Sequence, residues 1–160
     1  MRQKNSSEKS QERVKINNYL TRFALIYTLN ITILLSLKYQ VGLENSLVFT
    51  VIIILSARFT SHKFILDNRR LFNSNERAKL LWYSWSLVWF ISIIATTILT
   101  YIFAGRETLS VLVAKFSTMP TLEFITNIGI ASVISFALLY ITYGFNAKRE
   151  FDNLQKEGKI

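Results

Sequence analysis

The sequence predicts an all-α membrane protein in which four transmembrane helices form two helical hairpins. Three observations support this class. Of the 160 residues, 51% are hydrophobic; the charged residues gather between four long uncharged runs; and each run is continuously apolar rather than alternating. A hydrocarbon core roughly 30 Å thick takes about 20 helical residues, and backbone groups in lipid need partners within their own segment. A soluble four-helix bundle is disfavoured because its helices would each keep a polar face.

The uncharged runs locate the spans. No charged residue occurs in residues 23–37, 47–57, 80–105 and 124–147. Extended to a full crossing, they predict spans over about residues 19–38, 43–64, 80–104 and 123–146, within a transmembrane domain of residues 19–147. Two polar tails flank this domain, residues 1–18 and 148–160. The first tail lacks the apolar stretch of a cleavable signal peptide, so we expect the first span to direct its own insertion.

The connections between the spans differ in kind. Tyr39–Gly42 predicts a tight hairpin. Ile65–Lys79 is a short link with turn and cap signals, in which we expect Asn75 to cap a helix that starts near Glu76. Gly105–Leu122 is longer and half apolar, which predicts an interfacial or partly re-entrant helix on the far side of the membrane.

The basic residues predict the orientation. Sixteen of the 19 Lys and Arg residues fall in the two tails, in the central link and in the span ends next to them, and the remaining three are Lys38, Arg106 and Lys115. Because Lys and Arg near membrane ends are retained in the cytoplasm, both termini and the central link are predicted to be cytoplasmic. Topology and anionic lipid head groups explain the net charge of +9, so no nucleic-acid partner is expected.

Several polar residues near the cytoplasmic ends of the spans are candidates for binding an anionic lipid head group. Arginine offers a planar fork that can hold two phosphate oxygens, and residues four apart share one helix face. The candidates are Arg22, Arg58, His62, Lys63, Asn146 and Lys148, together with Asn30 inside the first span. Arg and Lys at helix ends also serve as topology anchors, and that alternative stays open for Arg22, Lys63 and Lys148. For Arg58 a binding role is favoured over that of a topology anchor, because apolar residues of its span follow it.

The sequence offers no enzyme chemistry. It contains no cysteine and one histidine, and no carboxylate cluster stands beside that histidine, so neither a metal site nor a cofactor is expected. We also find no nucleophile–base pair and no phosphate-binding loop. The chain is therefore predicted not to be an enzyme.

Short motifs at the helix ends resemble the GtrA-like family of small four-helix bacterial membrane proteins. The first span opens with Arg22-Phe23 and continues to Asn30, as in that family. The fourth span closes with a matching pattern, formed by Tyr143, Asn146, Lys148 and Phe151. The likeness extends over about residues 18–151 in length, topology and placement of the loops.

The resemblance implies a bacterial cytoplasmic (inner) membrane protein that moves a polyprenyl-phosphate-linked sugar between leaflets. A partner membrane glycosyltransferase would then use the sugar in polysaccharide or teichoic-acid glycosylation. The alternative is a scaffold that holds the transferase without transport. A small multidrug-type exporter is disfavoured because the first span has no acidic residue. A homo-oligomer is a further expectation, since 160 residues enclose little space for a bulky head group.

Overall fold

The computed structural model describes residues 16–41 and 46–160, all of whose regular structure is helical. The elements are α1 (Ile16–Val41), α2 (Ser46–Asn68), α3 (Ser74–Thr118), α4 (Thr121–Ile141), the π-helix η1 (Thr142–Asn146) and α5 (Ala147–Lys156). Four helical stretches are long and apolar enough to cross a membrane: α1, α2, α3 and the continuous run from α4 through α5. The all-α class with four candidate spans is therefore confirmed.

Two sequence predictions fall wholly or partly outside the described residues. Of the first tail, the structure describes only residues 16–18, which begin α1. Of the expected hairpin, Tyr39–Val41 are helical and end α1, whereas Gly42 lies outside the described ranges.

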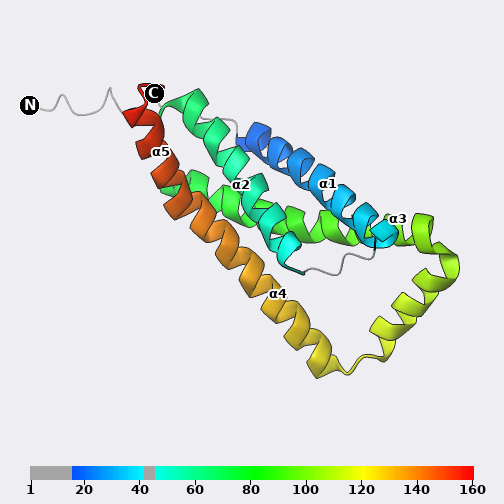
Figure 1. The fold of residues 1–160 in the computed structure, drawn as a ribbon. Coiled ribbons are helices and arrows are strands. Elements are labelled where there is room, and N and C mark those ends of the chain that lie inside the picture. The colour runs from blue at the N-terminus through cyan, green and yellow to red at the C-terminus, as the bar shows by residue number, and fades with distance from the viewer. Residues whose placement is uncertain (1–15, 42–45) are drawn as a thin grey trace, which may run out of the picture.

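Helix α1 packs against both α2 and α3, and the second half of α4 lies along α2 and α3 (Figure 1). Between them lies an apolar core: Phe23, Tyr27, Ile31, Ile52, Ile53, Ala57, Leu80, Leu81, Val88, Leu139 and Tyr143. The rings of Phe23 and Tyr27 stack with centroids 5.8 Å apart, and the Tyr27 hydroxyl bonds to the Ser92 hydroxyl at 2.8 Å. The bond between Tyr27 and Ser92 fixes the register of α1 against α3.

The molecule has two unlike ends. We call the end where α1 starts, α2 ends, α3 starts and α5 lies the basic end, and the other the far end. At the basic end, a second core of Ile65, Ala147 and Leu154 joins α5 to α2. At the far end α4 diverges from the other helices (Figure 1), and residues 121–131 are all exposed. Lipid chains are as apolar as these side chains and can solvate them without protein neighbours.

Gly105 interrupts α3 and separates an arm, residues 106–118, from the main helix. Its φ of 80° and ψ of 174° belong to a region that glycine alone adopts readily. Beyond it the arm is helical and folds back toward the start of α4 (Figure 1). The predicted helix in this connection is thus present, while its depth in a membrane stays a prediction.

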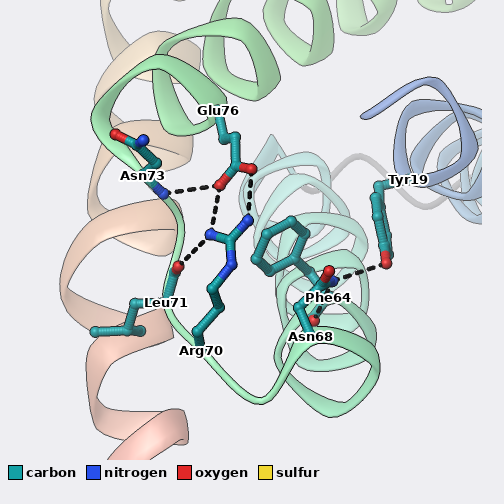
Figure 2. Close-up of polar contacts among 7 residues, drawn as sticks. All are labelled: Tyr19, Phe64, Asn68, Arg70, Leu71, Asn73 and Glu76. Carbon is teal, nitrogen blue, oxygen red and sulfur yellow. Dashed lines mark hydrogen bonds and ion pairs between the residues drawn. The ribbon is translucent and has the colours of Figure 1, made fainter. Parts of the chain in front are cut away.

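The link between α2 and α3 is held by a half-buried ion pair between Arg70 and Glu76 (Figure 2). Arg70 donates from both terminal nitrogens to Glu76, at 2.8 and 2.7 Å, and also to the carbonyl of Leu71 at 3.0 Å. The Arg70 guanidinium lies over the ring of Phe64, 5.4 Å from its centroid. The hydrogen bonds from Arg70 lower the pKa of Glu76, against an opposing effect of burial.

The start of α3 differs from the sequence prediction. The helix begins at Ser74 with Asn73 as the N-cap, so the prediction that Asn75 is the cap was wrong. Glu76 stands three residues after Asn73 and accepts a hydrogen bond from the Asn73 backbone N–H at 2.8 Å. This hydrogen bond satisfies a backbone donor that the helix leaves unpaired, which favours Asn73 over Asn75 as the cap.

Candidate anion-binding site

Helix α2 has two polar faces, one buried in the protein and one that contributes to the site. Ser56, Thr60 and Ser61 are fully or almost fully buried, and each hydroxyl donates to the carbonyl four residues earlier, at 2.8–2.9 Å. Satisfied in this way, small polar side chains let neighbouring helices approach closely. Arg58 and His62 stand one turn apart on a different face, which is the face that meets α5.

The π-helix η1 sets the register of α5. A π turn contains an extra residue, which rotates all following side chains about the helix axis. Within it Tyr143 is buried and its hydroxyl bonds to Ser84 at 2.8 Å. After the turn, Ala147 and Leu154 pack on α2. Glu150 follows Ala147 by three residues and therefore also faces α2.

Gly144 in the same turn makes room for an arginine. A Cβ there would fall on the guanidinium of Arg77. That guanidinium lies 4.4 Å from the ring centroid of Tyr140 and donates to the Tyr140 carbonyl at 3.3 Å. A π turn leaves carbonyls without their usual helical donor, and Arg77 supplies a donor to one nearby carbonyl.

One carboxylate of α5 contacts both Arg58 and His62 of α2. Glu150 Oε2 lies 3.3 Å from Arg58 Nη2, and Glu150 Oε1 lies 2.9 Å from His62 Nδ1. The Glu150 side chain is 19% exposed, whereas Arg58 is 62% exposed. The carboxylate is thus the fixed centre of the cluster, and the guanidinium reaches from it toward the surface. We call these three residues the α2–α5 cluster.

A cleft of about 320 Å³ opens beside the α2–α5 cluster, lined by Leu55, Arg58, Phe59, His62 and Glu150. One wall is charged and the other is apolar. A guanidinium has five N–H donors, and only Nη2 of Arg58 bonds to Glu150, so donors remain for a second anion. The arrangement can hold an anionic group against the charged wall and hydrocarbon against Leu55 and Phe59.

Sequence reasoning missed Glu150. The available signal was a short helical pattern in which Ala147, Glu150, Phe151 and Leu154 fall on one face. A single acidic residue on an otherwise apolar face marks a carboxylate that needs a cation across the interface.

The other predicted site residues lie apart from this cleft. Lys63 pairs with Asp67 at 2.6 Å on α2 itself, and the Asn30 amide donates to the carbonyl of Ile26 at 2.8 Å. Three more are placed without a contact to the α2–α5 cluster in the described residues: Arg22, exposed on α1; Asn146, half-buried at the end of η1; and Lys148, exposed on α5. Of the predicted set, the structure brings together Arg58 and His62.

Comparisons with protein-family models, with curated proteins and with solved structures found no match to this chain. In residues 16–41 and 46–160, no three His, Asp or Glu side chains gather in a way that would hold a metal ion.

Proposed function

We propose that this protein moves a polyprenyl-phosphate-linked monosaccharide across a bacterial cytoplasmic membrane for a partner glycosyltransferase. The observation that carries the proposal is the cleft at the basic end, where a partly free guanidinium faces apolar side chains. A lipid phosphate needs both surfaces at once. The proposal also rests on the resemblance to the GtrA-like family in short motifs at the helix ends and in the length and expected topology of the chain.

In this proposal Glu150 positions Arg58 and His62, and Arg58 contacts the phosphate. The carboxylate holds Arg58 and His62 in place from the buried side. The phosphate binds the exposed side of the guanidinium, which can offer two parallel N–H donors. The prenyl chain lies along Leu55 and Phe59. Removal of Glu150 would leave the guanidinium without its fixed orientation.

The proposed topology has both termini and the α2–α3 link in the cytoplasm, because the basic end carries most of the Lys and Arg residues. The phosphate site then faces the leaflet in which the lipid-linked sugar is made. Cysteines introduced singly test the topology in intact cells, since the chain has none of its own. Labelling of a cysteine at Asn153 by a membrane-impermeant maleimide would contradict it.

The direct test is leaflet exchange of a polyprenyl-phosphate sugar in liposomes that contain the purified chain. Wild-type protein should speed exchange at least tenfold over empty liposomes. Arg58→Ala should return the rate to that of empty liposomes, while the matched control Arg149→Ala, on the exposed side of α5, should keep it. Normal exchange by Arg58→Ala would remove the proposed site.

A scaffold without transport is the second candidate. The observation that favours it is that Glu150 already pairs with both Arg58 and His62, as in a purely structural clamp between α2 and α5. A scaffold predicts no exchange by any variant and loss of transferase binding when the clamp is broken by Glu150→Gln. The transport proposal predicts that Arg58→Ala still binds the transferase.

A further inference from the structure

A second groove lies between α1 and α3, on helices that take no part in the α2–α5 cluster. Its volume is about 810 Å³, within the range of roughly 300–1,000 Å³ typical of sites for small molecules. It is lined by Asn17, Leu20, Thr21 and Ala24 of α1 and by Tyr83, Ser86, Leu87 and Phe90 of α3.

The α1 wall and the α3 wall of the groove run in the same direction, because both helices start at the basic end. The groove therefore has a polar end beside the basic end of the molecule and an apolar end farther along the two helices. The hydroxyl of Tyr27 bonds to that of Ser92, and farther along Tyr39 bonds to Thr100, which shows that α1 and α3 advance together. Asn17 thus lies nearest the basic end of the groove, and Ala24 and Phe90 lie deepest along the helices.

The two aliphatic hydroxyl groups within the groove bond to carbonyls of their own helices. Thr21 Oγ1 donates to the carbonyl of Asn17 at 3.0 Å, and Ser86 Oγ donates to the carbonyl of Trp82 at 3.0 Å. Hydroxyl protons used in this way leave a wall that hydrocarbon can cover without an unsatisfied donor. The deeper half therefore suits an acyl chain.

A cation stands at the polar end. Lys79 is exposed and lies one turn before Tyr83 on the same face of α3. The acidic residue on that face, Glu76, is already bound to Arg70 and to the Asn73 backbone N–H. The charge of Glu76 is thus compensated, so it does not cancel the positive charge of Lys79 at the mouth of the groove.

We propose that this groove binds one anionic phospholipid from the leaflet at the basic end, with an acyl chain between α1 and α3 and the phosphate near Lys79. The inference is independent of the transport proposal, because it uses other helices and other residues. The bound lipid would fill the groove and stabilise the packing of α1 on α3.

Native mass spectrometry of the full chain with added lipid tests the proposal. Phosphatidylglycerol and phosphatidylcholine with identical acyl chains are compared at equal concentration. Wild-type protein should retain phosphatidylglycerol at least fivefold more than phosphatidylcholine. Ala24→Trp fills the groove and should lose both lipids, whereas Ala131→Trp, exposed on α4, should retain them as wild type does. Lys79→Ala should abolish the preference and keep phosphatidylcholine binding.

A second filling variant guards against misfolding. Ser86→Trp enters the same groove from an exposed position and should also lose both lipids, with an unchanged circular dichroism spectrum. Retention of phosphatidylglycerol by a folded Ala24→Trp or Ser86→Trp would overturn the proposal. Loss of retention in Arg58→Ala alone would also overturn it, because the bound lipid would then occupy the cleft beside α5.

Discussion

The two ends of the molecule handle their polar groups in opposite ways. At the basic end, charged side chains form specific pairs: Arg70 with Glu76 ties the α2–α3 link to the first turn of α3, and Arg58 with Glu150 joins α2 to α5. At the far end, α4 starts with eleven consecutive exposed residues, 121–131, and the arm 106–118 makes a bend without a buried core of its own. The basic end is held together by contacts between helices, whereas α4 and the arm at the far end make few such contacts.

This difference follows from the solvent at each end. Near water, apolar burial stabilises contacts between helices, so α5 gains by packing Leu154 against α2. Inside lipid, helix association depends on close packing and hydrogen bonds, because lipid solvates apolar side chains as well as protein does. Substitutions at the two ends should therefore have unlike effects on stability.

The largest contrast is expected from the same substitution at the two ends. Leu154→Ala removes a side chain that is 4% exposed and should lower the free energy of unfolding by about 2–5 kcal/mol. Leu122→Ala, at a position that is 79% exposed, should change it by less than about 0.5 kcal/mol. Chemical denaturation in detergent, followed by circular dichroism, measures both. Equal losses would show that the far end is packed as tightly as the basic end.

Breaking the ion pair of the α2–α3 link should have the next largest effect. Arg70→Ala leaves the half-buried Glu76 carboxylate without two hydrogen bonds, for a loss of about 1–2 kcal/mol. The control is Arg106→Ala in the exposed arm, which should be neutral in the same denaturation experiment. A neutral Arg70→Ala would show that the pair between Arg70 and Glu76 does not stabilise the link.

Acid should weaken the same link to a smaller degree. The pKa of Glu76 in the folded protein is lowered from its ordinary value of 4.5 by the hydrogen bonds from Arg70. The resulting stabilisation is complete above pH 4.5 and is lost as the pH falls through the lowered value. The difference in unfolding free energy between wild type and Arg70→Ala should therefore shrink from pH 6 to pH 3. A constant difference would contradict this linkage.

The smallest effect on stability, but a visible one on shape, is expected at the kink of α3. Gly105→Ala places a side chain at φ 80°, a strain of about 1–3 kcal/mol that the unpacked arm can relieve by changing its bend. Global stability should stay within about 0.5 kcal/mol of wild type. Spin labels at Ile98→Cys and Val113→Cys should report a changed distance, whereas Gly129→Ala should leave it unchanged. An unchanged distance in Gly105→Ala would show that other contacts hold the arm.

Much of the fold was predictable because it follows from composition along the chain. The uncharged runs around Asn30 and Ser132 predicted helical spans without any knowledge of neighbours. The N-cap of α3 was predicted at Asn75, two residues after its true position at Asn73, because both residues are asparagines and residue type alone does not separate them. What distinguishes Asn73 is that Glu76 follows it by three residues, a spacing that lets the carboxylate reach back to the N-cap backbone.

Of the α2–α5 cluster, the sequence predicted the two residues of α2 but not the residue of α5. Arg58 and His62 share a face because they are four residues apart on one helix, a relation that the sequence itself contains. Their partner, Glu150, stands 92 residues after Arg58, and its position depends on the extra residue of η1. If residues 142–146 formed a regular α-helix, Glu150 would point to a different side of the helix.

By itself, the sequence determined that four apolar helices form and that basic residues gather at one end, since both properties are local and additive along the chain. Only the tertiary structure decided which charges meet and which face lipid. Pairing depends on helix register, a π turn and a glycine kink, each of which changes the direction of side chains far along the chain from its own position.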